Sequence, residues 1–174
     1  MRALELKTRF HSSGLHLAAP GRCAPAGPQS LPQVVQATVG KLNTSLLRPV
    51  ARSFSNLAFQ PRFMLALLTH CYAHQVYGSA DIAGLLAKDA ALGKVCQNEL
   101  PGAGMIRQFR NDNRQAIRTC LTAALSFLAR QKMDAGIVTK VNEATLAEEA
   151  SRRLTMAMWM DSTETSRAPE PLSS

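Results

Sequence analysis

The helical spacing of apolar residues is the feature that most constrains how this chain can fold. Apolar side chains recur every three to four positions in five stretches, and no stretch alternates apolar and polar residues as a half-buried strand would. Proline, glycine and serine, which commonly begin and end helices, separate the stretches. The sequence therefore predicts an all-α fold, with helices at about 34–54, 61–77, 79–96, 105–131 and 142–161.

The same pattern predicts one compact helical domain with flexible ends. Of the 174 residues, 46% are hydrophobic and 18% are charged, which is sufficient for one core. Residues 12–32 concentrate Gly, Pro, Ser and Ala without periodicity. We expect a flexible basic arm at 1–33, the helical domain at 34–161 and a disordered tail at 162–174. The arm also has the composition of an organellar transit peptide, and that alternative stays open.

Positive charge is concentrated in two zones of the chain. The formal net charge of the chain is +8. Residues 1–62 hold eight Lys or Arg and one acidic residue, and residues 102–132 hold six Lys or Arg and one acidic residue. Such zones favour a polyanionic partner, because neutralising phosphates releases condensed counterions. The charge distribution therefore points toward a nucleic acid.

Several other classes of protein are not supported. The four cysteines form no C-x-x-C pair, so neither a zinc ribbon nor a disulfide framework is predicted, and a reducing cytoplasm fits best. The apolar runs are much shorter than the roughly 20 residues of a transmembrane helix, so no membrane partner is expected. No carboxylate accompanies a nucleophile or a phosphate loop, so we predict no catalytic centre, small-molecule substrate or cofactor.

Two features near helices could bind ligands but have simpler explanations. His70 and His74 stand four residues apart, a spacing at which two imidazoles can share a metal ion. No third ligand is evident nearby, so we expect one or both in the helix packing or at its edge and predict no metal site. The methionines and the tryptophan at 156–160 are likewise expected to close the core rather than to bind a partner.

The helix predicted from Met105 carries the candidate binding residues. At about 100° per residue, Ile106, Phe109 and Ile117 fall on an apolar arc, and four arginines fall on the neighbouring arc. Spacings of three, four and four keep the arginines on one side, where they can reach phosphates or guanine edges. The predicted DNA contacts are Arg107, Arg110, Asn111, Arg114 and Arg118.

The segment before this helix favours a helix-turn-helix-like element. A helix at 79–96, capped by Ser79, precedes a turn rich in glycine and proline. This turn is longer than in a compact helix-turn-helix, which indicates a looser variant. An ordinary surface helix whose arginines are solvated is the open alternative.

Three blocks of the chain resemble the N-terminal domain of insertion-sequence transposases. They are QPRFMLALL at 60–68, YAHQVYGSADI at 72–82 and MIRQFRNDNR at 105–114. Their order and spacing resemble the family's, and the resemblance covers residues 57–128. The closing helix, from Ala147 to Asp161, is similar to the end of short stand-alone members.

This resemblance implies binding to double-stranded DNA at the ends of a mobile element, with Arg107, Arg110 and Arg114 as the contacts. Where family members have a polar turn before this helix, the chain has Leu100–Gly104, so a function of that turn is not expected here. Longer relatives continue into a ribonuclease-H-like domain whose three acidic residues hold two metal ions. Since the chain ends at Ser174, the resemblance implies a non-catalytic DNA-binding protein of the bacterial cytoplasm.

Two further interpretations stay open at this point. The chain could be a helical interaction unit that pairs with itself or with a catalytic transposase through the 142–161 helix, using Leu154 and Met158. It could also be an inactive relic. Loss of salt-dependent DNA binding when Arg107 and Arg110 are replaced would favour the DNA-binding interpretation.

Overall fold

The computed structural model describes residues 29–49, 60–89, 100–138 and 140–167. Within these ranges the chain forms six α-helices, one short 3-10 turn at Thr44–Leu46 and no strand, so the predicted all-α class is confirmed. Most of the predicted basic arm and the last part of the predicted tail lie outside the described residues. None of the described helices is long and apolar enough to cross a bilayer.

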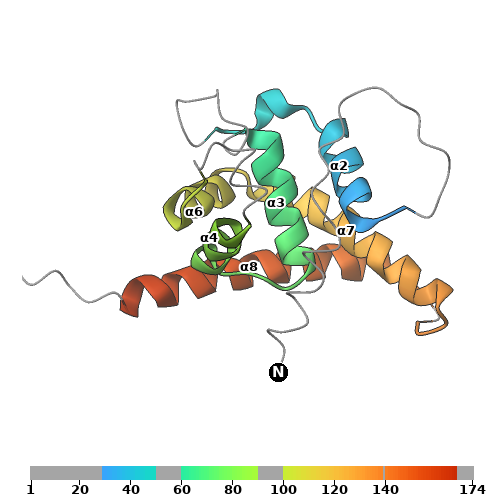
Figure 1. Cartoon of the computed structure of the whole chain (residues 1–174). Helices are drawn as coiled ribbons and strands as arrows, with labels where there is room; N and C mark the ends of the chain where they lie inside the picture. Colours follow the sequence, from blue (N-terminus) through green and yellow to red (C-terminus); the bar gives the residue numbers. More distant parts are fainter. Residues whose placement is uncertain (1–28, 50–59, 90–99, 139, 168–174) are drawn as a thin grey trace, which may run out of the picture.

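Helix α3, Pro61–Ala73, is the centre of the fold and is buried at most of its positions. Pro61 suits its first turn because that position needs no amide donor. Figure 1 shows α2 and α7 on one side of α3, α4 and α6 on the other, and α8 running beneath them. The remaining bounds are α2 Leu31–Lys41, α4 Ser79–Lys88, α6 Ala103–Asp112, α7 Arg114–Asp134 and α8 Glu143–Arg167.

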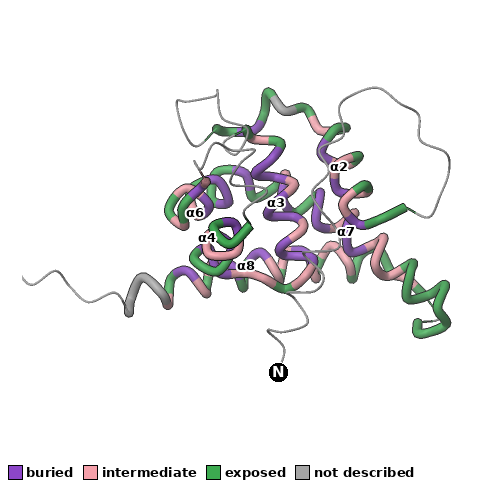
Figure 2. Tube along the Cα trace, in the orientation of Figure 1, coloured by how far each residue is buried: buried purple, intermediate pink, exposed green. Residues whose placement is uncertain are grey.

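One hydrophobic core holds all six helices together. It lies where α3, α7 and α8 meet, and Figure 2 shows the buried residues of each helix turned toward this region. The apolar arc of Ile106, Phe109 and Ile117 that helical spacing predicted contributes to this core. Its fully buried members include Leu65, Leu68, Ile82, Ile106, Phe109, Ile117, Leu121, Ala124, Ala150 and Ala157.

Several predicted helix ends are wrong. Helix α2 covers Leu31–Lys41 rather than starting at residue 34, because Ser30 forms a capping box with Gln33, whose Oε1 accepts the Ser30 N–H at 2.8 Å. Leu31 therefore belongs to the core and not to the flexible arm. The predicted continuation of this helix to residue 54 also fails, since α2 ends at Lys41; residues 50–54 lie outside the described part.

Helix α3 ends at Ala73, four residues before the predicted end at residue 77. Gln75 adopts a left-handed backbone with φ 64°, and the Val76 N–H donates to the Cys71 carbonyl at 2.9 Å, which closes the helix. Gly78 is instead the N-cap of α4, so Ser79 is the first residue of that helix and not its cap.

The long helix predicted at 105–131 is two helices. Helices α6 and α7 meet at Asn113, whose backbone leaves the helical region at φ −123° and ψ 27°. Helix α8 continues to Arg167, so the predicted tail begins too early. In its last turns the Ser162 and Thr163 hydroxyls donate to the carbonyls of Trp159 and Met160, each at 2.7 Å, and satisfy polar groups within the helix.

The helix-turn-helix-like element stays a prediction. Helices α4 and α6 pack against each other, as such an element requires. Most of the segment that joins them, residues 90–99, lies outside the described part of the chain.

Candidate nucleic-acid interface

Helix α6 has a buried face and an exposed face, and the predicted contacts Arg107 and Asn111 lie at or on the exposed one. Ile106 and Phe109 are fully buried and fix the helix on the domain. Gln108 and Asn111 are exposed. Arg107 lies at the margin, with 37% of its side chain exposed. Figure 2 shows the exposed residues of α6 on its outer side.

Arg110, predicted as a DNA contact, lies inside the protein with only 1% of its surface exposed. Its Nη2 pairs with Asp161 Oδ2 on α8, and its Nη1 donates to the Tyr72 hydroxyl and to Ser79 Oγ, each at 3.3 Å. A guanidinium held in this way cannot reach a phosphate, so the assignment of Arg110 to the DNA surface is wrong for this fold.

The spacing of α6 carried a signal for this position. Arg110 follows Ile106 by four residues, so helical geometry places it on the same side of α6 as this buried side chain. The sequence could not identify its partner, because Asp161 is 51 residues away and on another helix.

Asp161 is the acceptor at the centre of this buried polar cluster. Its Oδ1 accepts the Ser79 backbone N–H at 2.8 Å, and its Oδ2 accepts the Ser79 hydroxyl at 2.6 Å. Burial alone would raise the pKa of Asp161, but the hydrogen bonds from Ser79 and Arg110 outweigh it and hold the pKa below its ordinary value. Asp161 is therefore an ionised anchor that ties α8 to the start of α4 and to α6.

Arg107 is held near the same carboxylate. Its Nε lies 3.9 Å from Asp161 Oδ2, beyond hydrogen-bond distance but within the range of an ion pair. The cluster thereby restricts the direction of a partly exposed cation at the edge of α6.

Asn113 connects the α6–α7 junction to Arg48, which belongs to the N-terminal basic zone. Its side-chain oxygen accepts the Arg48 N–H at 2.8 Å, and its amide nitrogen donates to the Arg48 carbonyl at 3.0 Å and to the Phe109 carbonyl at 2.9 Å. Asn113 is buried, whereas Arg48 and Arg114 are exposed. These bonds place the main chain of Arg48 beside the start of α7, which sequence spacing did not indicate.

The first turns of α7 continue the exposed face of α6. Arg114 Nη2 donates to Asn111 Oδ1 at 3.5 Å, a contact that joins the two helices across their junction. Arg118 lies one turn further along α7 and is exposed. We call Arg107, Gln108, Asn111, Arg114 and Arg118 the basic face.

The basic face ends at an open groove of about 700 Å³ between α7 and α8. Arg118 lies on the α7 wall, and Glu143 and Glu148 lie on the α8 wall. The carboxylates on the α8 wall would repel a polyanion. A nucleic acid on the basic face would therefore extend toward α6 rather than across α8.

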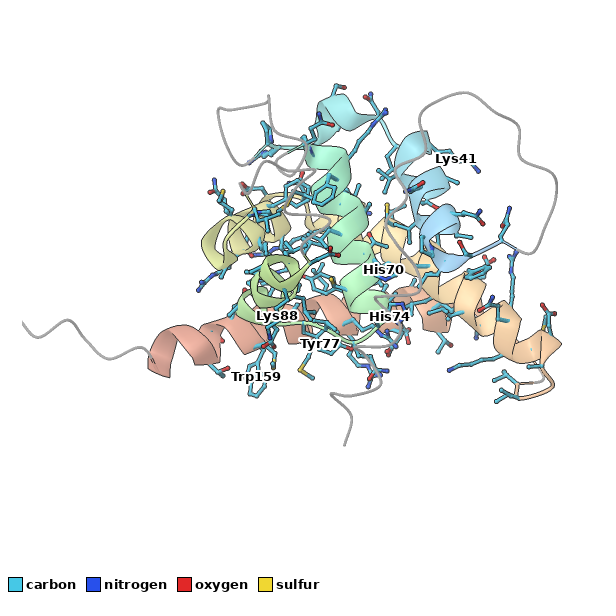
Figure 3. The ribbon with its side chains drawn as sticks, in the orientation of Figure 1. Lys41, His70, His74, Tyr77, Lys88 and Trp159 are labelled. Atoms are coloured by element: carbon cyan, nitrogen blue, oxygen red, sulfur yellow. The ribbon has the colours of Figure 1, made fainter. Side chains whose placement is uncertain are left out.

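The two histidines predicted to lie in helix packing contact each other at the end of α3, as Figure 3 shows. The His70 and His74 ring centroids are 4.6 Å apart in an edge-to-face arrangement. Burial, with a smaller contribution from His74, lowers the pKa of His70 to about 4. Within the described ranges, no group of three or more metal-ligating side chains lies close enough together to hold an ion.

The comparisons with known proteins do not assign this chain to a family. No protein-family model, curated protein or solved structure matches it.

Proposed function

We propose that the chain is a non-catalytic DNA-binding module, similar in role to the N-terminal domain of an insertion-sequence transposase, and that it binds double-stranded DNA through the basic face. The observation that carries the proposal is the contact between Asn111 and Arg114, which joins the exposed side chains of two helices into one surface. Asp112 is the only acid among residues 102–132, so this surface has a clear positive excess.

The side chains of the basic face suit two kinds of contact with a duplex. Arginine pairs with guanine edges, and glutamine and asparagine pair with adenine, so Arg107, Gln108 and Asn111 suit base reading from α6. Arg114 and Arg118, at the beginning of α7, suit phosphate contacts that fix the orientation of the protein on the DNA. Binding of this kind needs no cofactor and would take place on cytoplasmic DNA at the ends of a mobile element.

The experiment is a titration of the full chain with a fluorescent random duplex across a salt series. Replacing Arg107, Arg114 and Arg118 together by Ala should weaken binding and reduce the slope of log K against log [salt] by about 2 to 3. The matched control replaces Arg130, Lys132 and Lys140, three exposed cations beyond the basic face, and removes the same charge. The proposal requires a much larger loss in the first variant than in the control.

The same titration distinguishes the basic face from other sources of affinity. Equal losses in the two variants would mean binding by overall charge, and no loss in either would move binding to the basic N-terminal residues. Either result contradicts the proposal.

A second experiment tests sequence reading. Sites selected from a random pool should be bound more tightly than the pool, and replacing Gln108 and Asn111 by Ala should remove that preference while leaving the salt slope nearly unchanged. If the selected sites show no preference, the base-reading role of α6 is wrong and phosphate contacts alone remain.

A further inference from the structure

Helix α8 has an outward-facing stripe that carries two exposed large apolar side chains. Its inward face contributes Ala150, Leu154 and Ala157 to the core, so Leu154, considered from the sequence as a docking residue, is occupied. On the opposite face, Met156 is 42% and Trp159 58% exposed, so the prediction that these two side chains close the core is wrong. Figure 3 shows Trp159 below α8, on the side away from the other helices.

A partly fixed cation lies on the same stripe, one turn before Met156. The Arg152 side chain is 76% exposed, and Glu149 holds it through Oε2, which accepts from Nε at 2.7 Å and lies 2.5 Å from Nη2. A guanidinium held at its edge keeps its flat faces free to stack on an aromatic ring. The outward stripe consists of Glu149, Arg152, Met156, Trp159 and Thr163, at spacings of three and four residues. Within it, a cation lies on one side of Met156 and an indole on the other.

We propose that this stripe is a self-association surface on which α8 pairs with α8 of a second copy of the chain, in antiparallel orientation. With the two-fold axis between positions 155 and 156, Trp159 of each copy lies opposite Arg152 of the other, and the two Met156 side chains meet near the centre. Each copy contributes the same patch, as a closed two-fold dimer requires. The pairing places two cation–π contacts around a methionine centre.

Charge decides between the two possible orientations. A parallel pair would place Arg152 against Arg152 and Glu149 against Glu149, and like charges in such positions repel. The antiparallel pair places Arg152 against an indole and Glu148 near Thr163. The stripe complements itself in the antiparallel orientation, and this self-complementarity supports a second copy of the chain as the occupant.

The inference goes beyond DNA binding and can fail independently of it. Trp159 is the only tryptophan in the chain, so its emission reports directly on this stripe. With increasing concentration of the full chain, we expect the emission to shift to the blue as the indole is buried, and the mass from light scattering to rise from 18.8 kDa to twice that value. Arg152→Ala should raise the protein concentration at which both changes occur at least tenfold. Ile137→Ala replaces an exposed apolar residue outside α8 and should leave that concentration unchanged.

Cross-linking tests the orientation. In a background with Cys23→Ser and Cys96→Ser, where the remaining Cys71 and Cys120 are buried, Met156→Cys should form an intermolecular disulfide on mild oxidation. Thr145→Cys lies one turn before Glu149 on the same side of α8 but far from the proposed axis, so it should not cross-link. Cross-linking of Thr145→Cys would indicate a parallel pair and overturn the proposal. A monomer with unchanged Trp159 emission up to about 100 µM would also overturn it, and DNA binding by that monomer would leave the proposed function standing.

Discussion

Arg110 on α6 and Asp161 on α8 form a buried ion pair that ties the helix carrying the basic face to the helix carrying the outward stripe. Arg110 Nε has no hydrogen-bond partner among the described residues, so the guanidinium depends on its other two nitrogens for compensation. Ser79 completes the cluster by donating twice to Asp161. Both proposed surfaces therefore depend on one set of polar contacts inside the protein.

Replacing Arg110 should destabilise the fold strongly. Arg110→Met keeps much of the side-chain volume but leaves the Asp161 carboxylate buried without its cation, a change that typically costs about 3–5 kcal/mol. Urea denaturation of the variant and the wild type measures the difference. Arg152→Met breaks an exposed pair and should cost at most about 1 kcal/mol. Comparable losses in the two variants would show that the buried pair has no special weight.

Stability in acid should depend on Asp161. Because its folded pKa lies below the ordinary 3.8, the unfolded chain binds more protons in acid. The stabilisation is fully present above that value and is lost as the pH falls through the folded pKa. The wild type should therefore lose its advantage over Asp161→Asn in free energy of unfolding as the pH falls from about 5 to about 2. A constant difference over this range would contradict a lowered pKa.

His70 should cause a second pH dependence of stability, at higher pH than that of Asp161. Unfolded His70 takes up a proton near pH 6.5, whereas the folded group resists protonation down to about pH 4. Stability should therefore fall as the pH decreases from 6.5 to 4, by up to about 3 kcal/mol. His70→Phe should flatten this slope in thermal denaturation. His74→Phe should keep most of it, because burial is the larger cause of the shift; a slope that survives His70→Phe would assign it to another group.

Asn113 should stabilise the junction of α6 and α7 through its three side-chain hydrogen bonds. Asn113→Ala removes the partner of the Arg48 N–H and one donor to each of two carbonyls, at a cost of about 1–3 kcal/mol. Asn113→Asp should not restore stability, because its second oxygen would face those carbonyls. Asn111→Ala, two residues earlier and exposed, should change stability by less than about 0.5 kcal/mol in the same denaturation experiment. If Asn113→Asp were as stable as the wild type, the hydrogen bond from the Arg48 N–H would be the only one of the three that stabilises the junction.

The all-α class and much of the core follow from local spacing. Ile106, Phe109 and Ile117 were predicted to face inward because helical geometry places them on one arc, and the structure buries all three. The helix ends were less predictable. At the break, the Asn113 side chain is bonded to Arg48, which lies 65 residues earlier, and periodicity contains no information on such a contact.

The sequence by itself determined that the chain is helical, that it has one apolar core, and that positive charge gathers at its N-terminal part and along residues 102–132. These properties depend on residue type and on neighbours within one or two turns. The tertiary structure alone decided which arginines are exposed: Arg114 and Arg118 face solvent, whereas Arg110 is buried against Asp161. It also decided that Trp159 faces outward. The reason is that exposure is set by the other helices packed against a side chain, and these come from distant parts of the chain.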